Sequence, residues 1–148
     1  MSLIRLTREL KSLQNDPPAE VEAAPRGEDM FLWDATIIGP DSTPYEGGAF
    51  NLELKFPQDY PYRPPEVKFL TKVFHPNINT KGEICLNILR DDWKASLTVR
   101  TILLSISSLL DEPNPKDPLV AEIANLYVTD RGKFDEMART WTEAHAMK

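Results

Sequence analysis

Residues 75–86 read HPNINTKGEICL, and this stretch decides both the fold and the site that the sequence indicates. It contains Cys85, the one cysteine in 148 residues, so an internal disulfide is excluded. The thiol is then either a small buried core residue or a nucleophile. His75 and Asn77 lie upstream, and a turn at Gly82 can bring them back beside the sulfur. This arrangement favours a nucleophile on irregular chain, where functional residues often lie.

One helix and four strands are predicted before this stretch. Helical spacing of apolar residues predicts a first helix that Ser2 caps and that ends at Asp16, the residue before Pro17, with an apolar stripe of Leu3, Leu6, Leu10 and Leu13. Alternating apolar residues predict strands over residues 21–24, 30–38, 49–56 and 66–70. Short connections between them predict an antiparallel meander. Residues 57–65, PQDYPYRPP, form a rigid loop in which the bond before Pro64 or Pro65 is a candidate for cis geometry.

Three helices are predicted after it. Residues 98–110 have a wide apolar face made of Val99, Ile102, Leu103, Ile106, Leu109 and Leu110. The proline-rich run 113–118 ends this helix. Two more helices follow over residues 119–129 and 130–146, and Asp130 caps the last. The expected class is therefore α+β, in a single domain over residues 1–148.

The composition excludes several classes of protein. Apolar residues are 41% and charged residues 27% of the chain, as in ordinary globular proteins. A net charge of −6 argues against duplex nucleic acid as a partner. No apolar stretch approaches the roughly 20 residues of a membrane span. One free cysteine without a secretory signal indicates a reducing compartment, the cytoplasm or nucleus. Without CxxC, paired histidines or GxxxxGK, neither metal nor cofactor is expected.

Three residues are candidates for the chemistry around the thiol. His75 is either a base for Cys85 or a packed ring that holds its own turn, and the second is preferred because spacing alone does not place the ring beside the sulfur. Asn77 can donate to a developing oxyanion or cap its own turn, and the two roles are compatible. Asp117 is either a solvated turn residue or the acceptor of a proton from a lysine amine, whose free pKa is about 10.4.

The sequence resembles the ubiquitin-conjugating enzymes along its whole length. The resemblance is carried by MFLWDATIIGP, TPYEGG, FPQDYPYRPP, FLTKVFHPNI, GEICLNIL, WKASLTVRTILLSISSLL, EPNPKDPLV and AEIANLY, in family order. It is closest to the small, broadly acting subfamily that works with many RING and HECT ligases, without terminal extensions. It implies the family's fold: an N-terminal helix, a four-stranded meander, a long central helix and two C-terminal helices.

The resemblance also implies a reaction and its residues. Ubiquitin would pass from an activating enzyme to Cys85 as a thioester, then to a lysine with a RING or U-box ligase, or to a HECT ligase cysteine. Asn77 and Asp117 would be catalytic, with support from His75, Asn114 and Leu119. Expected contacts are Arg5, Tyr62, Lys94, Ala95 and Ser96 for ligases, and Arg5 and Arg8 for the activating enzyme. The enzyme is expected to be a monomer without a cofactor.

The sequence departs from the subfamily pattern at several positions. Ile4 stands where a basic residue is usual, Asn87 where an acidic one is common, and 94–96 read KAS. Glu22 replaces a serine of the rear surface that binds a second ubiquitin, so weak binding is expected there. Three alternatives remain: a non-catalytic module of this fold, an enzyme for another ubiquitin-like modifier, and a Cys-His hydrolase. Cys85 together with Asn77 and Asp117 argues against the first.

Overall fold

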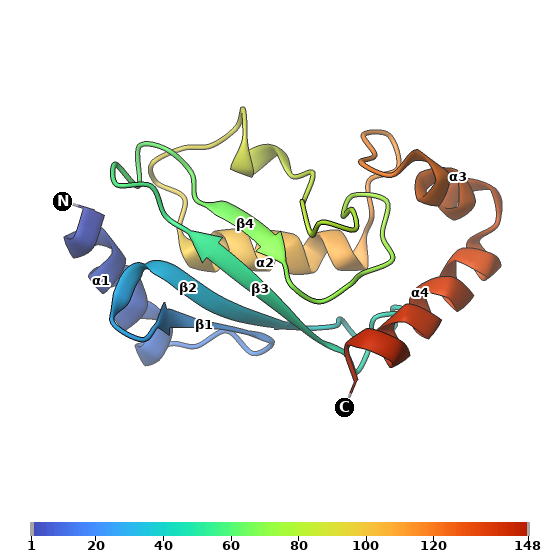
Figure 1. Ribbon diagram of the computed structural model, residues 1–148, viewed down its shortest axis with the longest axis horizontal. Coiled ribbons are helices and arrows are strands. Elements are labelled where there is room, and N and C mark those ends of the chain that lie inside the picture. Colours follow the sequence, from blue (N-terminus) through green and yellow to red (C-terminus); the bar gives the residue numbers. More distant parts are fainter. Residues whose placement is uncertain (1, 148) are drawn as a thin grey trace.

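The computed structural model describes residues 2–147 and has the predicted order of one helix, four strands and three further helices (Figure 1). The elements are α1 Ser2–Asn15, β1 Val21–Arg26, β2 Asp29–Ile38, β3 Ala49–Lys55, β4 Glu66–Phe69, the 3-10 turn η1 Asn87–Leu89, α2 Val99–Asp111, α3 Ala121–Thr129 and α4 Arg131–His145. The α+β class and the order of the elements are therefore confirmed.

The four strands form one antiparallel sheet in the order β1-β2-β3-β4. Ala35 of β2 lies opposite Leu52 of β3, which in turn lies opposite Phe69 of β4. Alternation along each strand sends one set of side chains inward. The alternating apolar residues of the two central strands are buried at Trp33, Ala35 and Ile37 on β2 and at Phe50, Leu52 and Leu54 on β3, whereas Phe31 of the same predicted set is only partly buried.

Helix α2 lies across one face of this sheet (Figure 1). The whole predicted apolar face of α2, from Val99 to Leu110, is buried. Thr98 caps the helix, since its side-chain oxygen accepts the N–H of Thr101 at 3.2 Å. Burial of this face against the sheet contributes hydrophobic stabilisation to the fold.

The outer helices follow the predicted positions with local differences. In α1, Leu6 and Leu13 are buried but Leu3 is 52% exposed, so the apolar stripe is shorter than predicted. Ser2 lies within α1 and its hydroxyl donates to the carbonyl of Gln58. Asp130 caps α4 as predicted, accepting the N–H of Lys133.

Two element boundaries and the position of the cis peptide bond also differ from the sequence prediction. Helix α3 begins at Ala121 rather than residue 119, because the N–H groups of Leu119 and Val120 bond the carbonyl of Pro76. Strand β1 runs on to Arg26 past Pro25, which an edge strand tolerates. The cis bond lies at Tyr60–Pro61, not before Pro64 or Pro65. Among residues 2–147, no helix combines the length and apolarity of a membrane span.

Candidate active site

A tight turn at residues 79–83 brings Cys85 beside Asn77. The side-chain oxygen of Asn79 accepts the N–H groups of Lys81 and Glu83 at 3.0 and 2.9 Å. Gly82 has φ +84°, and a Cβ there would lie 2.0 Å from the Phe69 carbonyl oxygen, so only glycine fits. The chain then returns, and the N–H of Cys85 donates to the carbonyl of Asn77 at 2.9 Å.

His75 is fully buried and uses both of its ring nitrogens within the fold. Nδ1 accepts the N–H of Asn77 at 2.9 Å, and Nε2 lies 2.7 Å from the carbonyl oxygen of Leu109. Since a carbonyl only accepts, Nε2 carries the proton. Burial lowers the pKa of His75 to about 4 despite that bond, so the ring is neutral near pH 7. It orders the turn and has no nitrogen free to act as a base for Cys85.

Asn77 connects this turn to the loop between α2 and α3. Its side-chain nitrogen donates to the carbonyls of Asn114 and Asp117 at 2.9 and 3.0 Å. Its side-chain oxygen accepts the N–H of Asn114 at 2.9 Å. The carboxamide is fully buried, and both of its N–H donors are in use. To donate to an oxyanion, it would have to exchange one of these bonds.

The loop after α2 lies against the sulfur of Cys85. The main-chain carbonyl oxygen of Asp117 is 3.4 Å from Sγ, and its carboxylate Oδ2 is 3.5 Å away. The thiol is partly exposed. The structure thus brings together Cys85, Asn77 and Asp117, which lie on three separate segments. Of the expected supporting residues, Asn114 contacts Asn77 through its main chain, and Leu119 is 41% exposed next to this loop.

Arg90 is a site residue that the sequence interpretation missed. Its Nη2 lies 3.3 Å from Cys85 Sγ and 3.6 Å from Asp117 Oδ2. Burial raises the pKa of the Cys85 thiol most, the Arg90 charge lowers it, and Asp117 raises it further. A cation five positions after a candidate nucleophile was the available signal, since positive charge favours a thiolate.

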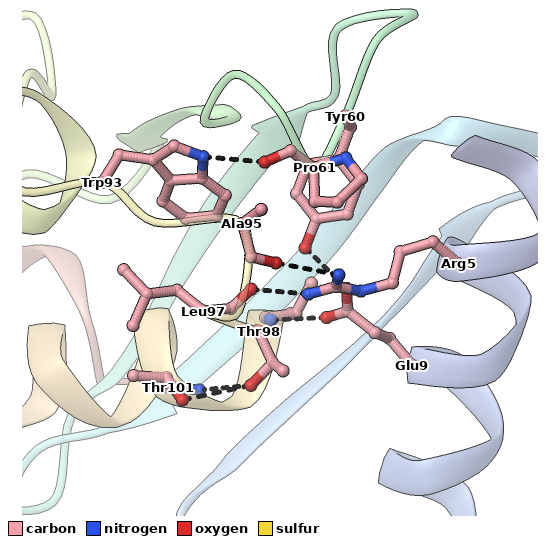
Figure 2. Close-up of polar contacts among 10 residues, drawn as sticks. Arg5, Glu9, Tyr60, Pro61, Trp93, Ala95, Leu97, Thr98 and Thr101 are labelled. Atoms are coloured by element: carbon pink, nitrogen blue, oxygen red, sulfur yellow. Dashed lines mark hydrogen bonds and ion pairs between the residues drawn. The ribbon is translucent and has the colours of Figure 1, made fainter. Parts of the chain in front are cut away.

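Apart from Arg5 on α1, the expected ligase-binding residues lie on two loops, and Figure 2 shows the contact between these loops at Trp93 and Pro61. Trp93 Nε1 donates to the carbonyl of Pro61 at 2.9 Å, which joins the loop carrying Tyr62 to the loop carrying residues 94–96. Tyr62 is 71% exposed, and Lys94, Ala95 and Ser96 are exposed as well. The structure therefore places these four residues on one accessible surface beside the start of α1.

Arg5 is expected to contact partner proteins, but in the structure its side chain is engaged in hydrogen bonds within the protein. Its guanidinium donates to the carbonyls of Ala95 at 2.9 Å and Leu97 at 2.8 Å, and to the Glu9 carboxylate at 2.8 Å (Figure 2). The side chain is only 25% exposed. Arg8, the other expected docking cation of α1, is exposed. Arg5 therefore holds the 95–97 loop against α1, and Arg8 is the more accessible cation for a partner.

Glu9 is the centre of this network and was not predicted from the sequence. It is 7% exposed, and its carboxylate also accepts the Tyr60 hydroxyl and the N–H of Val99, both at 2.6 Å (Figure 2). Burial first, and then the bond to Glu9, raise the pKa of Tyr60 well above its usual range, so the phenol remains a donor. One carboxylate thus links α1, the 57–65 loop and the start of α2.

Two further expectations concern the rear of the sheet and metals. Glu22 is exposed on β1, opposite Thr36 in the register, and its carboxylate is therefore hydrated. In the described part of the chain, residues 2–147, no group of three or more His, Cys, Asp or Glu side chains is arranged to hold a metal ion.

Comparison with known proteins shows which family and which solved structures the chain is similar to. The family model described as ubiquitin-conjugating enzyme matches residues 5–142, a span that includes Asn77, Cys85 and Asp117. A solved ubiquitin-conjugating enzyme E2 domain from Toxoplasma gondii is similar, with a TM-score of 0.91 and 44% sequence identity. That match covers 99% of this chain and 99% of the other.

Proposed function

The chain belongs to the ubiquitin-conjugating enzyme family, and from this membership we propose that it carries ubiquitin as a thioester on Cys85. The observation that supports the assignment is the position of Sγ, partly exposed and 3.5 Å from the carboxylate of Asp117. A nucleophile needs access to its substrate and a polar neighbour that can accept or donate a proton. Cys85 has both.

Loading is a thioester exchange. The Cys85 thiolate attacks the carbonyl carbon of ubiquitin held as a thioester on the activating enzyme. A carbon–sulfur bond to Cys85 forms, the old carbon–sulfur bond breaks, and the thiolate of the activating enzyme leaves. The new thioester keeps its acyl-transfer potential, because the Cys85 thiolate is itself a good leaving group in the next step.

Discharge follows one of two routes. A lysine amine attacks the thioester carbonyl, a carbon–nitrogen bond forms, and Cys85 leaves as a thiolate, while the amine proton passes to Asp117 or water. With a HECT ligase, a ligase thiolate attacks instead and the ubiquitin remains a thioester. The Asp117 carboxylate, 67% exposed, is positioned to meet the incoming amine. Asn77 holds the loop of Asn114 and Leu119 that borders this approach.

The partners are the activating enzyme, ubiquitin and ligases of the RING, U-box and HECT types, over the broad range of the subfamily that the sequence resembles. Tyr62 and residues 94–96 offer an exposed aromatic ring beside small side chains, a combination suited to a docking hot spot. Arg8 supplies an exposed cation on α1. The free thiol fits a reducing compartment, so we place the enzyme in the cytoplasm and nucleus.

One gel assay tests this proposal. The enzyme is mixed with ubiquitin-activating enzyme, ATP and ubiquitin, and the products are separated without reductant. A band one ubiquitin heavier should form and collapse when thiol is added. Cys85→Ser should give a thiol-resistant ester, because an ester exchanges with thiols far more slowly. Absence of any adduct across all enzyme concentrations would refute the proposal, and loading only with another modifier would redirect it.

A further inference from the structure

Three charged or reactive groups meet at the candidate active site. Arg90 Nη2 is 3.3 Å from Cys85 Sγ and 3.6 Å from Asp117 Oδ2, while Sγ and Oδ2 are 3.5 Å apart. The guanidinium therefore contacts the sulfur and the carboxylate at once. The side chains of Arg90 and Asp117 are 55% and 67% exposed, and an ion pair this exposed adds little to stability. The ion pair by itself therefore does not account for an arginine at this position.

The backbone of Arg90 is part of a compact turn. Its N–H donates to the carbonyl of Asn87 at 3.0 Å, and its own carbonyl accepts the N–H of Trp93 at 3.3 Å. The Asn87 side chain donates to the carboxylate of Asp92 at 2.8 Å, which closes the same turn. The guanidinium thus reaches the sulfur from a hydrogen-bonded turn directly after η1.

The charges around the sulfur act in opposite directions. In the described part of the chain, the charged groups that act on the thiol are Arg90, on the turn after η1, and Asp117, on the loop after α2. Burial raises the pKa of Cys85, Asp117 raises it further, and Arg90 opposes both. Without Arg90, a thiolate here would face a carboxylate at 3.5 Å with no compensating cation.

We propose that Arg90 is a further catalytic residue, which stabilises the Cys85 thiolate both as the attacking group in loading and as the leaving group in discharge. This inference rests on the proposed function of Cys85. In discharge, the carbon–sulfur bond breaks and its electron pair goes to Sγ, 3.3 Å from Nη2. In the thioester, where sulfur carries no charge, Arg90 keeps the Asp117 carboxylate as its anionic partner. When the thiolate forms, the sulfur becomes a second anion in contact with the same guanidinium.

The test measures the thiol directly and needs no ubiquitin. The alkylation rate of Cys85 by iodoacetamide, a neutral reagent, is followed by intact mass between about pH 6 and pH 10, a range that spans ordinary thiol pKa values. The variants are Arg90→Gln, which removes the charge but keeps a polar side chain, and Arg90→Lys, which keeps the charge. Arg90→Gln should raise the apparent pKa by about half a unit to one unit, as expected for one charge near 3.3 Å in a high dielectric. Arg90→Lys should restore part of the shift.

A second substitution separates charge from damage to the loop. Adding Asp117→Asn to Arg90→Gln should lower the apparent pKa again, because the unopposed carboxylate is gone. Single-turnover loading at neutral pH should fall about 3- to 10-fold in Arg90→Gln, in line with the smaller thiolate fraction. An unchanged alkylation profile in Arg90→Gln, with an unchanged melting temperature, would overturn the inference. If the profile shifts while no variant loads ubiquitin, the role of Arg90 stands and the proposed function fails.

Discussion

At the scale of one residue, Asn77 has two candidate roles that use the same carboxamide: holding the loop of Asp117 and donating a hydrogen bond to an oxyanion. Both N–H groups of its carboxamide hold main-chain carbonyls of the loop that carries Asp117. A role as oxyanion donor requires one of these bonds to open, whereas a role in holding the loop does not. Each role acts on the approach of the lysine, and neither is needed for Cys85 to reach the activating enzyme.

Asn77→Ala should therefore keep thioester loading while slowing discharge onto free lysine by about 10²-fold, the scale of losing one oxyanion donor. The measurement is a pulse-chase: load, quench the activating enzyme, add lysine and follow the thioester band. Asn77→Asp, which keeps an acceptor for the Asn114 N–H but has no donor, should discharge as slowly. Equal losses of loading and discharge would instead show that Asn77 is needed for the stability of the fold.

His75 makes stability depend on pH. Its pKa of about 4 in the fold lies below the ordinary value of 6.5, so the unfolded chain binds a proton more readily. The stabilising contribution is complete above pH 6.5 and is lost as the pH falls toward 4. From these two values the loss between pH 7 and pH 5 is about 2 kcal/mol.

Urea unfolding at a series of pH values measures this dependence. His75→Gln cannot titrate, so its free energy of unfolding should change by about 2 kcal/mol less than that of the wild type between pH 7 and pH 5. The difference in slope is the readout, because the substitution also changes stability at every pH. Parallel pH profiles for the two proteins would contradict a buried neutral imidazole.

At the scale of elements, Glu9 joins α1 to the 57–65 loop and to the start of α2. Glu9→Gln removes the charge and one acceptor, so a buried donor among Arg5, Tyr60 and Val99 loses its partner. The free energy of unfolding should fall by about 3 kcal/mol, as for a lost hydrogen bond to a charged group. Urea denaturation measures it. Arg8→Ala, an exposed change on the same helix, should stay within about 0.5 kcal/mol of wild type.

Tyr62 belongs to the same 57–65 loop as Tyr60, but its side chain faces solvent. Since it is 71% exposed, Tyr62→Ala should leave the melting temperature and thioester loading nearly intact. Ligase-stimulated discharge should be abolished, because an exposed aromatic anchor is lost. Tyr62→Phe, which keeps the ring, should retain stimulation. Equal losses in loading and stimulated discharge for Tyr62→Ala would show that the substitution damages the fold.

At the scale of the whole molecule, the rear of the sheet is a surface separate from the active-site loops. Glu22 projects from β1, and its neighbours around a shallow groove include Thr36 and Ile38. A second ubiquitin seated there would have to desolvate the carboxylate or stay away from it, and an unpaired buried charge is costly. The rear surface is therefore expected to bind free ubiquitin weakly or not at all.

An NMR titration with ubiquitin tests this expectation on the unmodified protein and on Glu22→Ser. Glu22→Ser should gain saturable shifts on β1 and β2 and should build ubiquitin chains faster. Glu122→Ser, which removes an exposed carboxylate on α3 outside this groove, is the control and should resemble wild type. Saturable shifts in the wild type, no weaker than in Glu22→Ser, would show that Glu22 turns into water and leaves binding unchanged.

The elements and the core could be predicted because burial is periodic along the chain. The alternation of Phe50, Leu52 and Leu54, and the face of α2, correspond residue by residue to what is buried. The turn at Gly82 was predictable too, because glycine is typical of turns. The structure adds the reason for a glycine there, since φ is positive and a Cβ would meet the Phe69 carbonyl. The sequence by itself therefore determined the fold, and it indicated that Cys85 returns to the neighbourhood of Asn77.

Only the tertiary structure decided which polar groups meet. Glu9 resembles any surface carboxylate of an amphipathic helix until Tyr60 and Val99 converge on it. The bonds of Asn77 to the loop after α2, and the contact of Arg90 with Cys85, depend on how distant segments cross. Hydrophobic burial is written into local periodicity, whereas a hydrogen bond or ion pair is set by distances of a few ångströms between segments that sequence spacing does not specify.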